Sequence, residues 1–133
     1  MSNDGTDLVR GLYAAFGRGE IDAILAAVTP GVSWESVGRS EDYPAFGPRH
    51  GVEAVRDFFR FVAENQEFTD FSPREFYAAD DKVFVLGHYE AIVKKTGRKV
   101  ATDWVHVVTL QDGKVSRWRE HTDTAQFAEA WRG

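Results

Sequence analysis

Two segments near the C-terminal end carry a histidine and a carboxylate in patterns that suit proton transfer. Strand alternation places His106 on the same face as Trp104, and in the following segment it places Glu120 on the same face as Trp118. Indole rings around an acid disfavour its charged form, which makes Glu120 a candidate general base. A histidine titrates close to neutrality, so His106 could hydrogen-bond a substrate carbonyl or donate a proton. We therefore expect Glu120 and His106 to form a catalytic pair.

The turn at residues 112–113 decides how the two segments face each other. A strict two-residue turn would pair His106 with Arg119, whereas a three-residue loop with a glycine bulge shifts the pairing by one residue. The bulged register sets His106 opposite Trp118 and makes Glu120 its diagonal neighbour. We expect the bulged register, because it gathers the tryptophans on one concave face. The alternative is that Glu120 pairs with an arginine at a dimer surface and His106 is a core histidine.

The apolar pattern predicts the elements that must position this pair. Apolar residues at helical spacing indicate helices, and long β-rich segments between short turns indicate an antiparallel meander. The expected helices cover residues 7–16, 20–28 and 52–65, with a last one from the cap Asp123 to Trp131. The expected strands cover residues 32–37, 67–79, 82–94, 99–110 and 114–122. Glycines and prolines predict an irregular loop over residues 38–51. The fold class is therefore α+β.

Composition narrows the classes of protein. A chain of 133 residues with 43% hydrophobic residues is expected to form one domain, residues 1–133. A formal net charge of -5, with scattered lysines and arginines, argues against a nucleic-acid partner. The absence of cysteine excludes disulfides and thiolate zinc sites. The sequence shows neither a secretory signal nor a membrane-spanning stretch, so we expect a cytoplasmic protein without a membrane partner.

Several short phrases resemble one known family. They are Leu12–Phe16 before Gly19–Ile21, Gly51–Val55 before Phe58-Phe59, Thr96–Arg98, Asp112–Val115 and Asp123-Thr124. Together with the order of elements, they resemble the SnoaL-like and ketosteroid-isomerase-like branch of the nuclear transport factor two-like superfamily, over nearly the whole chain. The resemblance implies a cone-like, mainly antiparallel sheet of cystatin-like topology, with three helices enclosing a small apolar pocket. Because this fold hosts many chemistries, the resemblance is specific for fold and weak for activity.

The resemblance also implies where the pocket residues lie, since the concave face of the sheet lines the pocket in this family. The expected pocket residues are Tyr13, Phe16, Trp34, Phe59, Phe76, Tyr89, Trp104 and Trp118. The His106 and Glu120 pair resembles the strand histidine and last-strand acid of SnoaL-type polyketide cyclases, where the acid is an aspartate. The longer glutamate places its carboxylate differently, which puts the same substrate in doubt.

Two further acids are secondary candidates. Glu35 lies where the resemblance to ketosteroid isomerase implies the carboxylate that moves the proton. Alternation sets it opposite in sense to Trp34, so if Trp34 points inward, Glu35 is a solvated charge, which is the interpretation we favour. Asp123 fits a helix cap better than a catalyst.

The leading hypothesis is an enzyme of the isomerase or polyketide-cyclase type. It would perform cofactor-free acid-base chemistry on a small, largely apolar carbonyl compound. The alternatives are a non-catalytic domain that binds a hydrophobic ligand and a protein-association module. We expect no metal, because His50, His88 and His121 lack metal-ligand spacing with one another. Outward Val105, Val107 and Thr109 predict a homodimer through the convex sheet face.

Overall fold

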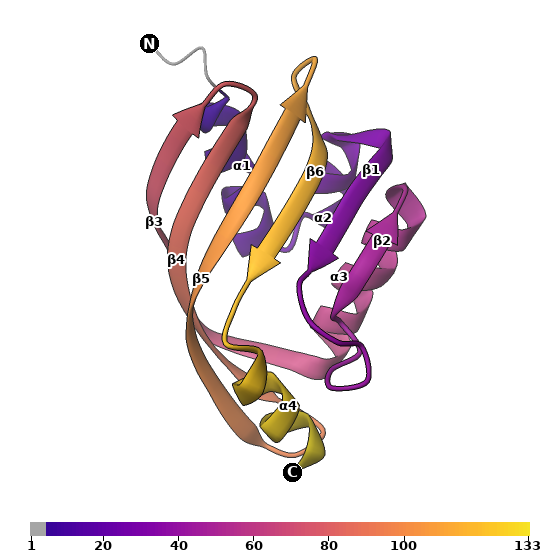
Figure 1. Cartoon of the computed structure of the whole chain (residues 1–133), viewed down its shortest axis with the longest axis vertical. Coiled ribbons are helices and arrows are strands. Elements are labelled where there is room, and N and C mark those ends of the chain that lie inside the picture. The colour runs from indigo at the N-terminus through magenta and orange to yellow at the C-terminus, as the bar shows by residue number, and fades with distance from the viewer. Residues whose placement is uncertain (1–4) are drawn as a thin grey trace.

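The first three helices lie on one side of a single curved sheet, and the last helix lies near one end of it. The computed structural model describes residues 5–133; residues 1–4 of the expected domain lie outside the described part. The helices are α1 (Thr6–Gly17), α2 (Ile21–Ala26), α3 (Val52–Asn65) and α4 (Thr124–Arg132). Figure 1 shows α1, α2 and α3 behind the sheet, with α4 near the end of β6. None of these helices is long and apolar enough to cross a membrane.

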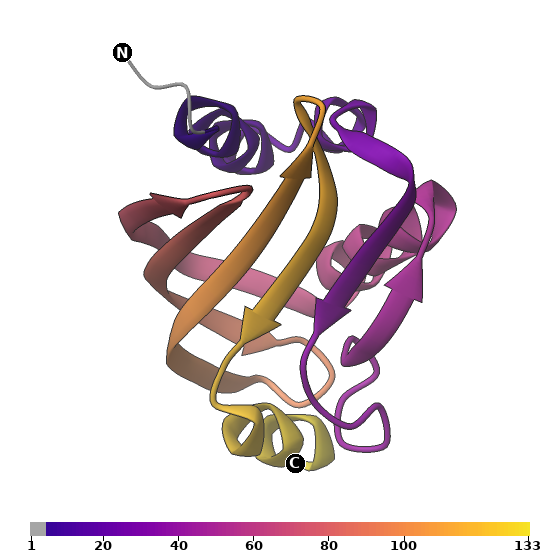
Figure 2. The same cartoon turned by 45° about the horizontal axis from the view of Figure 1, so that its top comes forward.

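The sheet is mostly antiparallel and does not close. Its six strands are β1 (Val28–Ser36), β2 (Gly47–His50), β3 (Gln66–Ala79), β4 (Lys82–Val93), β5 (Arg98–Gln111) and β6 (Lys114–His121). They lie in the order β2-β1-β6-β5-β4-β3, and only the β1 and β6 neighbours run parallel. The long strands bend, so that the sheet curls around the first helices (Figure 2). The expected α+β fold class with a curved sheet is confirmed.

The loop expected over residues 38–51 contains a strand that the sequence did not reveal. β2 pairs with β1, with Trp34 opposite Arg49, and it forms one edge of the sheet. Its first two residues are glycine and proline, which predict a loop and not a strand. The proline is tolerated here because β2 is an edge strand. The second helix is also shorter than expected. It ends at Ala26, and Val28 already pairs with Val115 of β6.

Strand β4 separates two environments by strict alternation. Buried and half-buried residues alternate from Lys82 to Val93, so one face of the sheet belongs to the interior and the other does not. Gly87 occupies an interior position opposite Trp104. A Cβ atom there would lie 2.4 Å from Cζ2 of Trp104. The glycine is therefore needed to make room for the indole ring.

The turn between β5 and β6 is tighter than expected. Asp112 and Gly113 have φ angles of 51° and 77°, as in a two-residue turn with both central residues in the left-handed region. The extra residue lies instead at Ser116 within β6, between the pairs Leu110 with Val115 and Thr109 with Arg117. Aspartate and glycine both tolerate positive φ, so the tight turn forms and the bulge moves into the strand.

This bulge corrects the expected register. His106 lies directly opposite Glu120, not opposite Trp118, and Val108 takes the place opposite Trp118. The shift by one residue runs in the direction opposite to the expected one. His106, Trp118 and Glu120 still share the inner face, where all three are buried.

Candidate functional site

The buried pair on β5 and β6 is the centre of the site. Nε2 of His106 lies 2.7 Å from Oε2 of Glu120, and Nδ1 of His106 lies 2.7 Å from the hydroxyl of Tyr13 on α1. The side chains of His106 and Glu120 are 3% and 9% exposed. A helix and two strands thus bring together three titratable groups from distant parts of the sequence.

The hydrogen bonds determine which of these three side chains donates and which accepts. An ionised carboxylate only accepts, so with Glu120 charged the proton of the imidazole sits on Nε2 of His106. Nδ1 is then an acceptor, and the phenol of Tyr13 donates to it. The order of donation is Tyr13 to His106 to Glu120, and we call these three residues the proton chain.

Glu120 accepts two more hydrogen bonds. Ser36 donates to Oε1 at 2.9 Å, and the hydroxyl of Tyr89 donates to Oε2 at 3.4 Å. Ser36 lies beside Glu120 because β1 runs parallel to β6 in that register. Ser36 was not among the expected site residues, although it follows the inward Trp34 by two residues and strand alternation could have identified it.

Burial keeps the two tyrosines beside Glu120 protonated. Desolvation raises the pKa of Tyr13 and of Tyr89 well above the ordinary value, and the negative charge of Glu120 adds to the effect. Both phenols therefore stay hydrogen-bond donors across the physiological range.

Stacked rings hold the imidazole in place. The ring of His106 lies 3.9 Å from the ring of Trp104 at an interplanar angle of 18°. The ring of Tyr13 is also stacked on that of His106, with the ring centroids 5.8 Å apart at an interplanar angle of 12°. The histidine is thus oriented by packing as well as by its two hydrogen bonds.

An apolar cavity of about 100 Å³ adjoins the proton chain. Its aromatic wall consists of Tyr13, Phe16, Trp34, Tyr43, Phe46, Phe58, Phe59, Phe68, Phe71, Tyr89, Trp118 and Phe127. The polar side chains of the wall are few and include those of Ser36, Gln66, His106 and Glu120. A dry cavity of ~150 Å³ holds one benzene molecule in another protein, so this one suits a ligand of about one small ring.

Two of the expected pocket residues are corrected by the structure. Six of them line the cavity, but Phe76 and Trp104 do not. Trp104 lies behind His106, in the space that Gly87 leaves free. Phe76 packs on the far side of Tyr13, where the guanidinium of Arg10 lies 4.0 Å from its ring centroid.

Wall residues on β3 and in the loop before β2 were also not among the expected site residues. Phe68 and Phe71 are three residues apart, which places them on opposite faces of a regular strand. A bulge at Thr69 turns both inward, so that Phe68 pairs with Ala91 and Phe71 with Tyr89. Tyr43 lies in the loop rich in glycine and proline, where no periodicity marks an inward residue.

The secondary acids lie outside the cavity wall. Glu35 points to the outer side of the sheet and forms an ion pair with Arg119 at 3.5 Å. Asp123 caps α4: its carboxylate accepts from the backbone N–H of Gln126 at 3.4 Å. Hydrogen bonds from the Gln126 side chain and backbone lower the pKa of Asp123.

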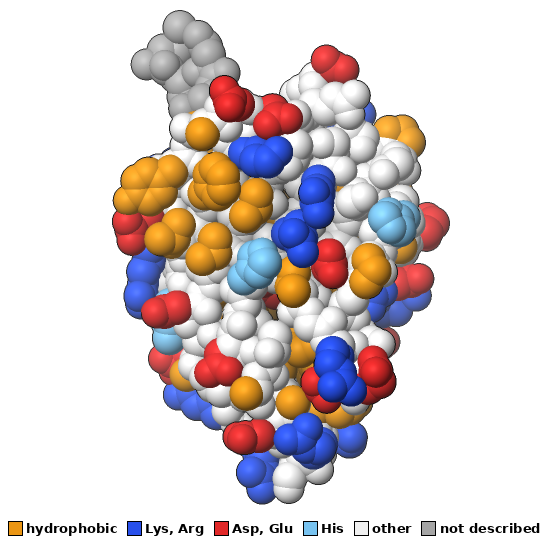
Figure 3. Space-filling view, in the orientation of Figure 1, with side chains coloured by type: hydrophobic (Ala, Val, Ile, Leu, Met, Phe, Trp, Pro, Cys, Tyr) orange, Lys and Arg blue, Asp and Glu red, His pale blue; other side chains and the backbone are white. Residues whose placement is uncertain are grey.

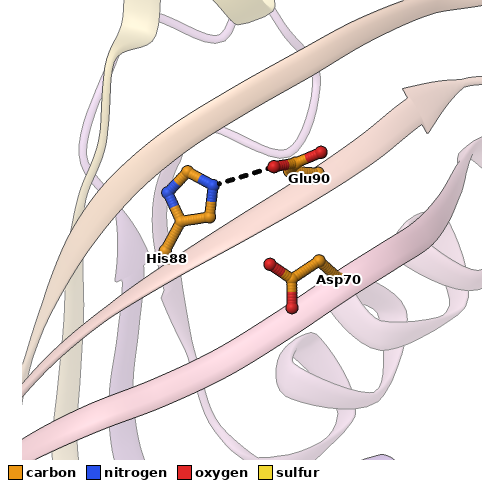
Figure 4. A group of neighbouring side chains, drawn as sticks. All are labelled: Asp70, His88 and Glu90. Carbon is orange, nitrogen blue, oxygen red and sulfur yellow. Dashed lines mark hydrogen bonds and ion pairs between the residues drawn. The ribbon is translucent and has the colours of Figure 1, made fainter.

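On the outer face, one group of side chains has the donor atoms of a metal site. Asp70, His88 and Glu90 each offer one ligand atom, and these atoms lie within 4.8 Å of one another (Figure 4). His88 bonds to Asp103 at 2.9 Å and to Glu90 at 3.2 Å, and Lys99 lies 2.7 Å from Glu90. The group is thus an ion-pair network with partners of its own, and the expectation of no metal stays a prediction.

Comparisons with known proteins agree with this architecture. The sequence model of the SnoaL-like domain family matches residues 9–118. An NTF2-like (nuclear transport factor two-like) protein of unknown function from Burkholderia pseudomallei is 30% identical, with a TM-score of 0.87 over 98% of each chain. An NTF2-like protein from Burkholderia xenovorans is also 30% identical, with a TM-score of 0.87 over 98% of this chain and 97% of that chain. TerC, co-crystallised with polyporic acid, is 27% identical, with a TM-score of 0.86 over 98% of this chain and 100% of that chain. A search of curated proteins found no match.

Proposed function

The chain belongs to the SnoaL-like domain family, and from that premise we propose that it is an enzyme performing cofactor-free acid-base chemistry on a small, largely apolar carbonyl compound. The observation that supports this most is the proton chain of Tyr13, His106 and Glu120 beside an apolar cavity. Enzymes commonly carry out proton transfer with titratable side chains that are hydrogen-bonded to one another in a pocket with little water.

In the proposed reaction Glu120 is the base. It takes a proton from the carbon next to the substrate carbonyl, and the electron pair of the C–H bond moves to the carbonyl oxygen to give an enolate. His106 and Tyr13 keep the carboxylate oriented through the chain of hydrogen bonds. In a ketone with a β,γ double bond, the enolate is conjugated with that bond, and return of the proton to the γ-carbon shifts the double bond to the α,β position. This completes an isomerisation without a change of oxidation state.

A non-catalytic ligand-binding domain is the second candidate. The observation that favours it is the completeness of the proton chain: both nitrogens of His106 are bonded within the protein, and Glu120 accepts from three side chains. Such a network could simply hold the cavity open. The co-crystallisation of TerC with polyporic acid supports ligand binding in this fold and is neutral about catalysis.

Proton exchange with solvent distinguishes the two candidates. Small ketones are incubated with the protein in D₂O, and loss of the α-proton signal is followed by NMR. We expect wild type to catalyse the exchange, and Glu120→Gln to slow it by about 10²- to 10⁴-fold with little change in ligand affinity. Glu35→Gln, which alters an acid on the outer side, is the matched control and should exchange as wild type does.

The outcomes separate cleanly. If wild type binds the ketones but exchanges no protons, the ligand-binding domain takes the place of the enzyme. If Glu120→Gln exchanges as fast as wild type, Glu120 is not the base.

We propose in addition that two copies associate through the outer face of the sheet. Apolar side chains gather there over β3, β4 and β5 (Figure 3). This outer patch consists of Tyr77, Phe84, Leu86, Val105 and Val107, which are neighbours in the strand pairing. Half-buried Thr109 lies on the same face. Val105 is 36% exposed and Tyr77 55%, so both add exposed apolar surface to a contiguous patch.

Sedimentation tests the association. Wild type should sediment at twice the chain mass of 15.0 kDa, and Val105→Lys should sediment as a single chain. Ala101→Lys, on the same strand but outside the outer patch, should leave the dimer intact. A wild-type monomer at roughly tens of micromolar contradicts the proposal.

A further inference from the structure

Trp34 carries a hydrogen-bond donor without a partner. The residue is 5% exposed, and its indole Nε1 is buried with no acceptor in the part of the chain that the structure describes. In the described part of the chain, side-chain atoms of Trp104 and Thr122 are also buried without a partner, and Nε of Arg119 makes no hydrogen bond but lies in the ion pair with Glu35. Of these residues only Trp34 belongs to the cavity wall.

The neighbours of Trp34 cannot satisfy this donor with their side chains. Its ring stacks on Trp118 at 4.4 Å and meets the edges of Phe58 and Phe59. An indole only donates, and phenyl rings offer no oxygen to accept. A buried donor without a partner is costly, and native proteins usually meet such a group with water or a ligand.

The proton chain, in contrast, leaves no donor free for a substrate oxygen. Tyr13 donates to His106, His106 donates to Glu120, and Tyr89 also donates to Glu120. A substrate oxygen in the cavity must therefore find its hydrogen bond elsewhere on the wall.

Trp34 stands at a suitable distance from the base. It lies two residues before Ser36 on β1, and Ser36 donates to Glu120. Two steps along a strand span roughly 7 Å. A ligand of one small ring can therefore place an oxygen at Trp34 and a carbon near Glu120.

Building on the proposed function, we propose that Trp34 Nε1 binds the acceptor oxygen of the ligand and so selects small cyclic ketones over hydrocarbons of the same shape. The rest of the ligand contacts aromatic rings of the wall, such as Phe16, Phe59 and Phe71. Trp34 is then the residue that decides which end of the ligand faces the base.

Two probes of matched shape test the proposal: cyclopentanone and cyclopentane. The protein is labelled with ¹⁵N, and the indole N–H signals are followed during titration, with Trp34→Phe identifying the signal of Trp34. Cyclopentanone should move the Trp34 signal downfield and leave that of Trp104 in place, because Trp104 does not line the cavity. Cyclopentane should produce no downfield shift.

Affinities provide the second measurement. Trp34→Phe keeps an aromatic ring but removes the donor, so it should weaken cyclopentanone binding about tenfold and leave cyclopentane binding nearly unchanged. Trp131→Phe changes an indole outside the cavity wall and should alter neither affinity. If Trp34→Phe fails to fold, Phe variants of the other three tryptophans identify their signals, and the remaining indole signal is that of Trp34. The shift in the wild-type protein then decides.

The proposal is overturned if Trp34→Phe weakens the binding of both probes equally or of neither. It is also overturned if no probe shifts the Trp34 signal. Failure of the catalytic proposal looks different. In that case the Trp34 signal shifts with cyclopentanone while proton exchange is absent, or is equal in wild type and Glu120→Gln.

Discussion

Two histidines on neighbouring strands differ in their surroundings more than in their hydrogen bonds. His106 on β5 and His88 on β4 each bond through both ring nitrogens, and each bonds to at least one carboxylate. His106 faces the interior, where its side chain is 3% exposed and Glu120 is its one acidic partner. His88 faces outward at 19% exposure, in the network that Figure 4 shows in part.

Burial determines what a histidine and a carboxylate can do. Outside, water screens the charges, and a pair of this kind contributes little to stability. In the interior, few alternative hydrogen-bond partners exist, so each polar group is satisfied only by its neighbours in the network. The donor and the acceptor of each hydrogen bond are therefore defined. The interior pair of His106 and Glu120 is therefore suited to proton transfer, whereas His88 and its carboxylate partners make the outer face of the strand polar.

Removing each histidine in turn gives the largest expected contrast. His106→Ala leaves Glu120 buried without its main partner and Tyr13 without an acceptor, so we expect a loss of about 3–5 kcal/mol in the free energy of unfolding. His88→Ala should cost far less, since Asp103 remains exposed to water and Glu90 keeps its ion pair with Lys99. Denaturant titration of both variants measures the difference. Equal costs would contradict the contrast drawn between the two faces.

Alkaline pH should separate the interior tyrosines from the exposed one. Because burial raises the pKa of Tyr13 and Tyr89, the fold favours their protonated form, whereas an unfolded tyrosine ionises near pH 10. Stability is then complete below about pH 10 and falls as the pH rises toward the folded pKa. The loss is about 1.4 kcal/mol per pH unit for each tyrosine that stays protonated.

The absorbance of phenolate, followed together with circular dichroism, tests this expectation. The interior tyrosines should ionise only as the protein unfolds, and Tyr13→Phe should make the alkaline transition shallower. Tyr77→Phe, at an exposed position, is the control with a smaller effect. Ionisation of Tyr13 and Tyr89 near pH 10 in a folded protein would show that the interior is open to water.

A methyl group at Gly87 should disturb the interior face of β4. Its Cβ would lie 2.4 Å from a ring atom of Trp104 and 2.7 Å from the carbonyl oxygen of Ser72. We expect Gly87→Ala to cost about 1–3 kcal/mol, measured by thermal or denaturant unfolding. Gly11→Ala, on helix α1 with nothing within 4 Å of the added Cβ, should be neutral or stabilising. A neutral Gly87→Ala would mean that the stack behind His106 is loosely packed.

The smallest effect is expected at the cap of α4, outside the cavity. Asp123→Ala should lower Tm by about 2–4 °C, whereas Asp123→Asn should retain most of the capping. Since hydrogen bonds from Gln126 lower the pKa of Asp123, its contribution is present above the unfolded pKa and is lost as the pH falls. A loss of proton exchange in Asp123→Ala would contradict its assignment as a cap.

The elements were predictable wherever periodicity was long. The amphipathic pattern of α3 and the alternation of β4 each extend over many residues, so their class and approximate ends followed from the sequence. Strand β2 was not predictable, because four residues beginning with glycine and proline have no pattern to read. Local propensity cannot reveal a strand that exists only because Trp34 and its neighbours offer an edge.

The site was predictable as a set of residues on one face, but not as a geometry. His106 and Glu120 could be placed on the inner face by alternation, whereas their contact depends on a bulge that no residue type announces. Tyr13 reaches His106 across 93 positions of sequence, a contact that tertiary packing alone decides. Phe68 and Phe71 were missed for the same reason as the register, since their bulge inverts the alternation.

The extra residue at Ser116 matters for aligning this chain with its relatives. Before Ser116, the inward residue of β6 is Val115, which has an odd residue number. After Ser116, the inward residues are Trp118 and Glu120, which have even residue numbers. A relative with the same turn and no extra residue, aligned without a gap, would have its inward residues matched to Arg117 and Arg119 of this chain. An acid that corresponds to Glu120 would then be read as a substitution by arginine. Alignments across β6 therefore need a one-residue gap wherever the bulge is absent, and apparent variability at these columns can reflect a misplaced gap instead of a change of chemistry.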